Sequence, residues 1–202
     1  MRFILIALAL LFPFWVMADE PRPNLPALYQ VTGVAEDDVL NMRAGPDAGA
    51  AMIDAFTNDA RDIQVIDLSL SGRWALVNTD EQAGWVAFRF LKRQPDLVGA
   101  AGLPASLQCF GTEPFWNLRI ADVDSVVLTT PDGRTVHPLT DTSLAAPFVD
   151  LAAAGFRFTW LLDGQPVVSH ILPGRCSDGM SDLAYGLHYI DSRLSHPGCC
   201  SL

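Results

Sequence analysis

Residues 107–120 have the sequence LQCFGTEPFWNLRI, and this stretch decides which fold we expect for the second half of the chain. After Pro114, the apolar residues Trp116, Leu118 and Ile120 alternate with polar residues. A period of two is typical of a β-strand that has one face in a core and the other in water. The stretch therefore predicts a half-buried strand at the start of a β domain.

The chain that follows has further runs of this kind, separated by turn signals. Residues 126–130 and 135–139 flank the sequence Pro-Asp-Gly-Arg, which predicts a hairpin. Residues 156–162 alternate again and end at Asp-Gly, after which another apolar run follows. Residues 144–154 predict a short helix. The remainder of residues 107–202 predicts an antiparallel β domain, either a barrel or a sandwich.

Residues 28–93 predict a second, smaller β domain. Short apolar runs alternate with polar turns, and five such runs in about 65 residues predict a small barrel. Residues 94–106 are rich in Gly and Pro and lack periodicity, which is typical of a linker. We therefore expect an all-β chain with two domains. The expected strands of the smaller domain are residues 29–34, 39–43, 63–68, 74–78 and 85–88.

Residues 1–18 have the features of a cleavable export signal. Arg2 precedes the apolar run 3–16, and Val-Met-Ala ends the segment with small residues at the two positions that signal peptidase recognises. The alternative is a retained membrane anchor, but a run of about 14 residues is shorter than the roughly 20 that a spanning helix needs. Residues 19–27 contain three prolines and predict an extended leader. We expect a periplasmic or secreted protein.

The charge of the chain limits its partners. The 202 residues include 13 Lys and Arg against 23 Asp and Glu, which gives a formal net charge of −10. Nucleic acids and acidic membrane surfaces bind through clustered basic residues, so this balance argues against both as partners. The length permits two small domains and excludes a large enzyme barrel.

The cysteines all lie in the second half of the chain, at Cys109, Cys176, Cys199 and Cys200. An even number of cysteines in an exported chain indicates disulfides. A bond between the adjacent Cys199 and Cys200 would have poor geometry. We therefore expect each of these two to pair with one of the distant cysteines, and the sequence leaves open which pairs with which.

Four short motifs follow one another in the smaller domain: VLNMRAGP at 39–46, IQVI at 63–66, GRWALV at 72–77 and GWVA at 84–87. In this order and spacing they resemble the motifs of bacterial SH3 domains, and the resemblance covers nearly all of residues 28–93. It implies an SH3-like barrel that binds cell-wall peptide or a protein partner. The chain departs from the family at residues 60–62, Ala-Arg-Asp, where a glycine usually precedes the third strand.

The SH3 resemblance implies a ligand groove that involves Arg43, Trp74 and Trp85. Considered without the family, the two tryptophans and Met42 are suited to the core of a small barrel, because small barrels need large apolar side chains to fill them. The sequence therefore leaves two alternatives for Trp74 and Trp85, core or ligand groove.

Arg43 also has two alternatives. A charged residue inside a strand is seldom buried without a partner. Arg43 therefore either pairs with an acidic neighbour, such as Asp37 or Asp38, or faces a ligand.

The larger domain contains CFGTEPFW at 109–116, CSDGMSD at 176–182 and GCC at 198–200. These motifs resemble a poorly characterised family of bacterial envelope proteins, which has looser similarity to C-type lysozyme inhibitors and to META-type β domains. The resemblance covers residues 107–202 and implies the envelope as the compartment. It also implies a second hypothesis, inhibition of lysozyme-type wall hydrolases by a loop with the candidate contact residues Ser181, Asp182 and Tyr185.

The CSDGMSD motif has two interpretations of its own. Asp178 and Asp182 flank a glycine and could hold a cation, but the ligand spacing of an EF-hand is absent. The alternative is a tight Asp-Gly turn held by a disulfide at Cys176.

Enzyme chemistry has weak support in the sequence. Ser169, His170 and His188 are present, but no G-x-S-x-G motif is. A zinc site could use His188, His196 and the last two cysteines, but adjacent residues on a strand point to opposite faces and do not easily share one metal. We therefore expect no catalytic residues, no metal and no cofactor. The first hypothesis is an exported envelope protein that binds through its SH3-like module; lysozyme inhibition and a small envelope enzyme are the alternatives.

Overall fold

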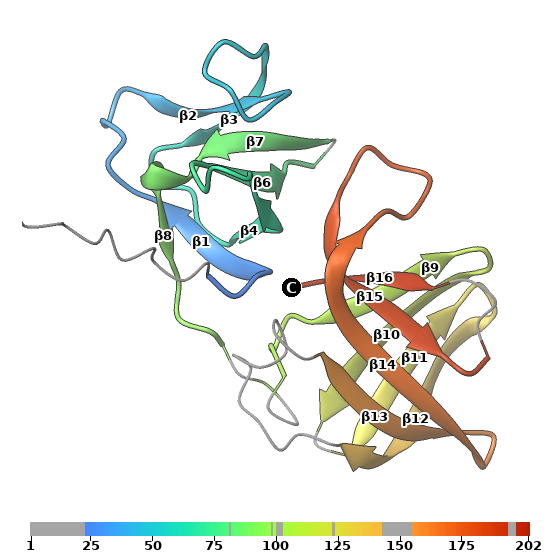
Figure 1. The fold of residues 1–202 in the computed structure, drawn as a ribbon. Helices are drawn as coiled ribbons and strands as arrows, with labels where there is room; N and C mark the ends of the chain where they lie inside the picture. The colour runs from blue at the N-terminus through green and yellow to red at the C-terminus, as the bar shows by residue number, and fades with distance from the viewer. Residues whose placement is uncertain are drawn as a thin grey trace, which may run out of the picture.

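The computed structural model describes residues 23–80, 82–97, 99, 103–122, 124–142, 155–193 and 197–202. The expected export signal, the first part of the leader and the expected helix at 144–154 lie outside these residues. The described chain is all-β, as predicted, and its strands form two units (Figure 1). In this part of the chain, no helix is long and apolar enough to cross a membrane.

The N-terminal unit consists of strands β1 to β8 in two antiparallel sheets. One sheet has the order β4-β1-β8 and the other β3-β2-β7-β6-β5. A single turn of 3-10 helix, Phe88–Phe90, joins β7 of the second sheet to β8 of the first. The strands are β1 Ala27–Val31, β2 Val39–Arg43, β3 Met52–Thr57, β4 Ile63–Val65, β5 Asp67–Leu68, β6 Trp74–Asn78, β7 Ala83–Ala87 and β8 Leu91–Arg93.

All five strands that the sequence predicts for this unit are present, although Ile66 divides the third into β4 and β5. Two strands were not predicted. Strand β3 is mostly exposed and has no alternation of buried and exposed residues, so its sequence lacks the expected signal. Strand β8 has three residues and is paired to the end of β1.

The core of the N-terminal unit is mostly aliphatic. Met42 is fully buried in it, as predicted. Trp74 and Trp85 are half-buried and lie outside this core, so the interpretation of the tryptophans as core residues is wrong. The reason is the pleat of the strand: β6 directs Ala75 and Val77 inward, so Trp74 points to the opposite face of the sheet.

The turn before β4, at residues 60–62, contains an aspartate in a conformation that favours glycine. Asp62 has a φ of 57°, in the left-handed region that glycine favours and that aspartate tolerates better than most residues. Its backbone amide donates to Oε1 of Gln94 at 2.9 Å, and Nε2 of Gln94 donates to its carboxylate at 3.1 Å. The reciprocal bonds with Gln94 therefore stabilise the turn without a glycine.

The C-terminal unit is a closed antiparallel barrel of eight strands in the order β10-β11-β12-β13-β14-β15-β16-β9 (Figure 1). Of the two predicted alternatives, barrel and sandwich, the barrel is correct. The predicted hairpin β11-β12 is present, but its turn is shorter than predicted, because Gly133 and Arg134 already pair with Thr130 and Thr129. The strands are β9 Gln108–Thr112, β10 Phe115–Asp122, β11 Ser125–Thr130, β12 Gly133–Thr142, β13 Phe156–Leu162, β14 Gln165–Cys176, β15 Tyr185–Asp191 and β16 Gly198–Ser201.

The barrel interior is filled by large side chains from several strands. Trp160, Phe158 and Tyr189 have no exposed surface, and they form one cluster with the aliphatic residues around them. Leu103, from the segment expected to be a linker, is 3% exposed and belongs to the same cluster. The end of this segment therefore packs into the barrel core.

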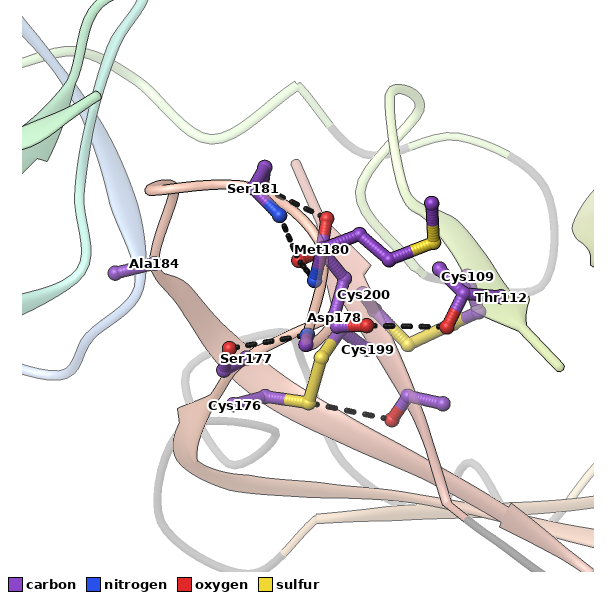
Figure 2. Close-up of a disulfide and its surroundings, with 12 residues drawn as sticks. Cys109, Thr112, Cys176, Ser177, Asp178, Met180, Ser181, Ala184, Cys199 and Cys200 are labelled. Carbon is purple, nitrogen blue, oxygen red and sulfur yellow. Dashed lines mark hydrogen bonds between the residues drawn. A yellow bond between two sulfur atoms is a disulfide. The ribbon is translucent and has the colours of Figure 1, made fainter. Parts of the chain in front are cut away.

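Both disulfides involve β16, and they lie on opposite sides of the barrel wall (Figure 2). Cys200 bonds to Cys109 in the main barrel core, and Cys199 bonds to Cys176 in a small separate cluster with Tyr185. The prediction that each adjacent cysteine pairs with a distant one is confirmed. Because successive residues of a strand point to opposite faces, the two neighbours reach different partners.

Trp116 occupies a place that two glycines leave open. A β-carbon on Gly111 would lie 2.7 Å from Cε2 of Trp116, and one on Gly198 would lie 2.5 Å from its Cζ2. The indole ring packs 5.0 Å from the ring of Tyr189 in the barrel core. Gly111 of the CFGTEPFW motif and Gly198 of the GCC motif thus leave the space that the Trp116 ring occupies.

We expect Gly111→Ala and Gly198→Ala each to lower the free energy of unfolding by about 1–3 kcal/mol, because the added methyl displaces the Trp116 ring from a packed core. Urea unfolding followed by tryptophan fluorescence measures this. Gly45→Ala is the control, since its new β-carbon would lie 3.7 Å from that of Ala50, an ordinary contact. Stabilities of the three variants equal to that of the parent chain would contradict the role of the two glycines.

Candidate functional site

The predicted groove residues lie on the outer face of the sheet β3-β2-β7-β6-β5. Arg43 of β2 pairs with Trp85 of β7, and Trp85 pairs with Leu76 of β6. Trp74 lies two residues before Leu76 and therefore on the same face. The register thus places Arg43, Trp74 and Trp85 on one surface of the N-terminal unit.

Two cavities share Trp74 in their walls. We call them the Arg43 cavity, of about 490 Å³, and the Arg73 cavity, of about 600 Å³. Both are lined by Ala48, Trp74, Ala87 and Arg89. The remaining lining residues of the Arg43 cavity are Gly33, Val34, Ala35, Asp38, Val39, Leu40, Asn41, Arg43 and Phe90. Those of the Arg73 cavity are Pro46, Asp47, Gly72, Arg73 and Phe88.

Arg43 has a partner that neither sequence alternative named. Its Nη1 donates to the main-chain carbonyl of Ala50 at 2.7 Å, across the loop that joins β2 to β3. Within the described residues Arg43 forms no ion pair, so the expected bond to Asp37 or Asp38 is not present. Asp38 lines the same cavity, and its Oδ1 accepts from the amide of Val39. Arg43 also lines this cavity.

The two other arginines of the site come from positions that sequence reasoning did not select. Arg89 lies in the 3-10 turn, with its guanidinium 4.6 Å from the centre of the Phe90 ring. Arg73 directly precedes Trp74. Arg73 lies within the GRWALV motif. However, an arginine at the end of a turn carries no sequence signal that distinguishes a ligand site from a solvated surface.

Trp85 lies beside the C-terminal barrel. The guanidinium of Arg175, at the end of β14, is 5.7 Å from the Trp85 ring and 3.3 Å from Oδ2 of Asp67. The structure therefore brings Arg43 and Trp74 together at the cavities and places Trp85 at the junction between the units.

The CSDGMSD segment is a tight loop held by the carboxylate of Asp178 (Figure 2). Oδ1 of Asp178 accepts from the amides of Met180 and Ser181, at 3.0 and 2.9 Å, and Oδ2 accepts from the Ser181 hydroxyl at 2.8 Å. Gly179 follows with a φ of 72°. The predicted Asp-Gly turn beside the Cys176 disulfide is confirmed, and its carboxylate is engaged by its own loop.

The loop after Asp178 joins the barrel to the N-terminal unit. The main chain of Asp182 forms a β-bridge with Gln82, and its carbonyl accepts from the amide of Ala83 at 2.8 Å. Asn78 at the end of β6 bonds twice to the backbone of Ala184: its Nδ2 donates to the carbonyl at 2.8 Å, and its Oδ1 accepts from the amide at 3.1 Å. This segment is therefore docked on the hairpin β6-β7.

The residues proposed for lysozyme inhibition lie in this docked segment. The Ser181 hydroxyl is bonded to Asp178, and the Asp182 backbone is bonded to the N-terminal unit. The Tyr185 ring is buried 4.8 Å from that of Phe110, and burial raises the pKa of its hydroxyl. The side chains of Ser181 and Asp182 remain exposed. Insertion of this loop into a hydrolase stays a prediction.

A buried chain of hydrogen bonds crosses the barrel interior. Nε1 of Trp160 donates to the Ser169 hydroxyl, which lies 2.7 Å from the hydroxyl of Tyr189. The Tyr189 hydroxyl donates in turn to Asp191 at 2.9 Å, and Arg193 donates to the same carboxylate. Burial raises the pKa of Tyr189. Each side chain of this hydrogen-bond network has its partner within the network. We therefore interpret the network as a structural brace of the barrel.

Among the described residues, no group of three or more His, Cys, Asp or Glu side chains is arranged to hold a metal ion. His196, named as a zinc candidate, lies outside the residues that the structure describes. All four cysteines are in disulfides, so they are not zinc ligands.

Comparison of the chain with protein-family models, with curated proteins and with solved structures finds no match. The resemblances to bacterial SH3 domains and to the envelope family therefore remain predictions from the motifs.

We expect Asn78→Ala to loosen the contact between the two units, because it removes both bonds to Ala184 and leaves a partly buried amide and carbonyl without partners, at a cost of about 1–3 kcal/mol. Hydrogen exchange of the Ala184 amide should become faster. Asn58→Ala is the matched control, since the Asn58 side chain donates to Ala35 within the N-terminal unit. Unchanged exchange at Ala184 would show that Asn78 does not hold the loop.

We expect the Asp178 loop to loosen in acid. Partial burial raises the pKa of this carboxyl, but the bonds from Ser181 and Met180 outweigh it and lower the pKa below its ordinary value of 3.8. A lowered pKa means that the carboxylate stabilises the folded loop above the ordinary value, and that this contribution is lost as the pH falls through the folded-state pKa.

The exchange protection of the Met180 and Ser181 amides should therefore decrease between about pH 5 and about pH 2, after correction for intrinsic exchange. In Asp178→Asn this pH dependence should disappear. Asp132→Asn, an exposed turn aspartate between β11 and β12, is the control and should retain it. Equal protection across this range in the parent chain would contradict the role of the Asp178 carboxylate.

Proposed function

We propose that this protein is an exported envelope protein whose N-terminal unit is an SH3-like module that binds an extended peptide of the cell wall. The observation that carries the proposal is the pair of cavities, of about 490 and 600 Å³, that share the half-buried Trp74 in their walls. A half-buried tryptophan outside the core presents apolar area to a ligand, and tryptophan and arginine are the residues that most often dominate peptide and protein binding.

Two cavities with a common wall suit an extended chain. Side chains of an extended peptide alternate in direction and are separated along the backbone, so a ligand that lies along Trp74 can place one group in each cavity. The polar groups in the walls, which include Asn41, Arg43 and Arg89, supply hydrogen-bond donors for its carbonyls and charged groups.

Two features support export. Residues 1–18 have the pattern of a cleavable signal, and the two disulfides of the barrel are of the kind that persists in oxidising compartments. In this proposal the barrel is a disulfide-braced support, docked against the module through Asn78 and Asp182.

We expect the full chain to be retained on purified peptidoglycan in a sedimentation assay, and Trp74→Ala to lower the bound fraction about tenfold or more, because truncation of a central binding tryptophan typically costs 2 kcal/mol or more. Phe115→Ala is the matched control, since Phe115 is an aromatic residue 56% exposed on the barrel. Thermal melting of both variants checks that they remain folded.

Retention of the parent chain no greater than that of a denatured sample would overturn the proposal for the cell wall. Retention of Trp74→Ala equal to that of the parent chain would show that the two cavities are not the binding site.

A further inference from the structure

The walls of the two Trp74 cavities are positively charged in an acidic protein. Together they contain Arg43, Arg73 and Arg89 against Asp38 and Asp47, whereas the whole chain has 13 basic and 23 acidic side chains. By contrast, the cavity at the junction near Gln64 has Asp54, Asp62 and Asp80 against Arg61. Three of the 13 basic side chains therefore lie together where the ligand of the proposed function would bind.

These three arginines are not neutralised by the described residues. Arg43 uses one nitrogen for the Ala50 carbonyl, Arg89 lies over the Phe90 ring, and neither they nor Arg73 form an ion pair in this part of the chain. Four other arginines of the described residues are each paired with an aspartate, whereas Arg61, Arg119 and Arg134 form no ion pair there. The paired arginines are Arg93, Arg157, Arg175 and Arg193.

The two acidic side chains of the walls bond to their own turns. Oδ1 of Asp38 accepts from the amide of Val39 at 2.8 Å, and Oδ1 of Asp47 accepts from the amide of Gly49 at 2.7 Å. Each also lines only one of the two cavities, whereas Arg89 lines both. The guanidinium groups therefore retain donors for an anion that enters beside Trp74.

We propose that the peptide bound at Trp74 carries a free carboxylate, and that Arg89 binds it together with Arg43 or Arg73. This inference rests on the proposed function. A guanidinium presents a planar fork of N–H donors that matches the two oxygens of a carboxylate, and a pair so formed is stronger than a neutral hydrogen bond. Arg89 lines both cavities, so it can contact the carboxylate in whichever of the two the carboxylate lies.

The experiment compares retention of the full chain on native peptidoglycan with retention on peptidoglycan whose carboxyl groups have been converted to primary amides with carbodiimide and ammonia. We expect amidation to lower the bound fraction about tenfold or more, the factor that corresponds to loss of one hydrogen-bonded charge pair. A non-specific effect would have the opposite sign, because amidation removes the repulsion between an acidic wall and a protein with a net charge of −10.

Arginine variants connect the effect to the cavities. Arg89→Gln should bind native peptidoglycan about as weakly as the parent chain binds the amidated form, and Arg73→Gln should lower binding by a smaller factor. Both side chains are exposed, so the variants should fold normally, which melting curves check. Arg119→Gln, an exposed arginine on β10, is the matched control and should bind as the parent chain does.

The outcomes separate this inference from the proposed function. Equal retention on native and amidated peptidoglycan, lost in Trp74→Ala, would overturn the carboxylate and leave the peptide-binding function in place. If amidation lowers the retention of Arg89→Gln and of the parent chain by the same factor, the carboxylate is bound by another surface. That result would also overturn the inference. No retention on either form would overturn both.

Discussion

The arrangement of the C-terminal unit depends on the opposite directions of two adjacent side chains. Cys199 and Cys200 are neighbours on β16, and the pleat of the strand sends one to each face of the barrel wall. The inner disulfide joins β16 to β9, the pair that closes the barrel. The outer disulfide joins β16 to the end of β14, from which the Asp178 loop begins. One strand therefore connects closure of the barrel with placement of the loop that contacts the N-terminal unit.

Alternation and turn chemistry predicted most of the fold because these signals are local. The runs around Phe156 and Phe158, the Pro-Asp turn of β11-β12 and the pairing rule for the cysteines each depend on neighbours in sequence. Strand β3 was missed because both of its faces are largely exposed, so burial leaves no pattern in it. The core alternative for Trp74 and Trp85 was wrong because residue size does not fix strand phase, and Trp-Ala-Leu-Val at 74–77 is apolar on both faces.

The candidate site was predictable only in part, because its residues meet through the sheet and across the two units. Motif resemblance selected Arg43 and Trp74, which the structure places at one cavity. It could not reveal that Arg43 bonds to the Ala50 carbonyl, or that Arg89 enters from a 3-10 turn, since both depend on how loops return to the sheet. The contact of Arg175 with Trp85 joins the two units through residues that are 90 positions apart in sequence, and no local signal encodes it.

The acidity of the chain and a cationic site act over different distances. At physiological ionic strength charges separated by more than about 8 Å are largely screened, so the net charge of −10 weakly opposes the approach of an acidic surface. At contact the nearest groups dominate, and beside Trp74 these are guanidinium groups against a partly apolar wall, where displaced water strengthens a charged hydrogen bond. Under the proposed function, an acidic protein with such a site would discriminate against bulk negative charge and accept a carboxylate on a chain that also fits along Trp74. Selectivity would then arise from the combination of charge and shape, since neither the general repulsion nor the three arginines alone would provide it.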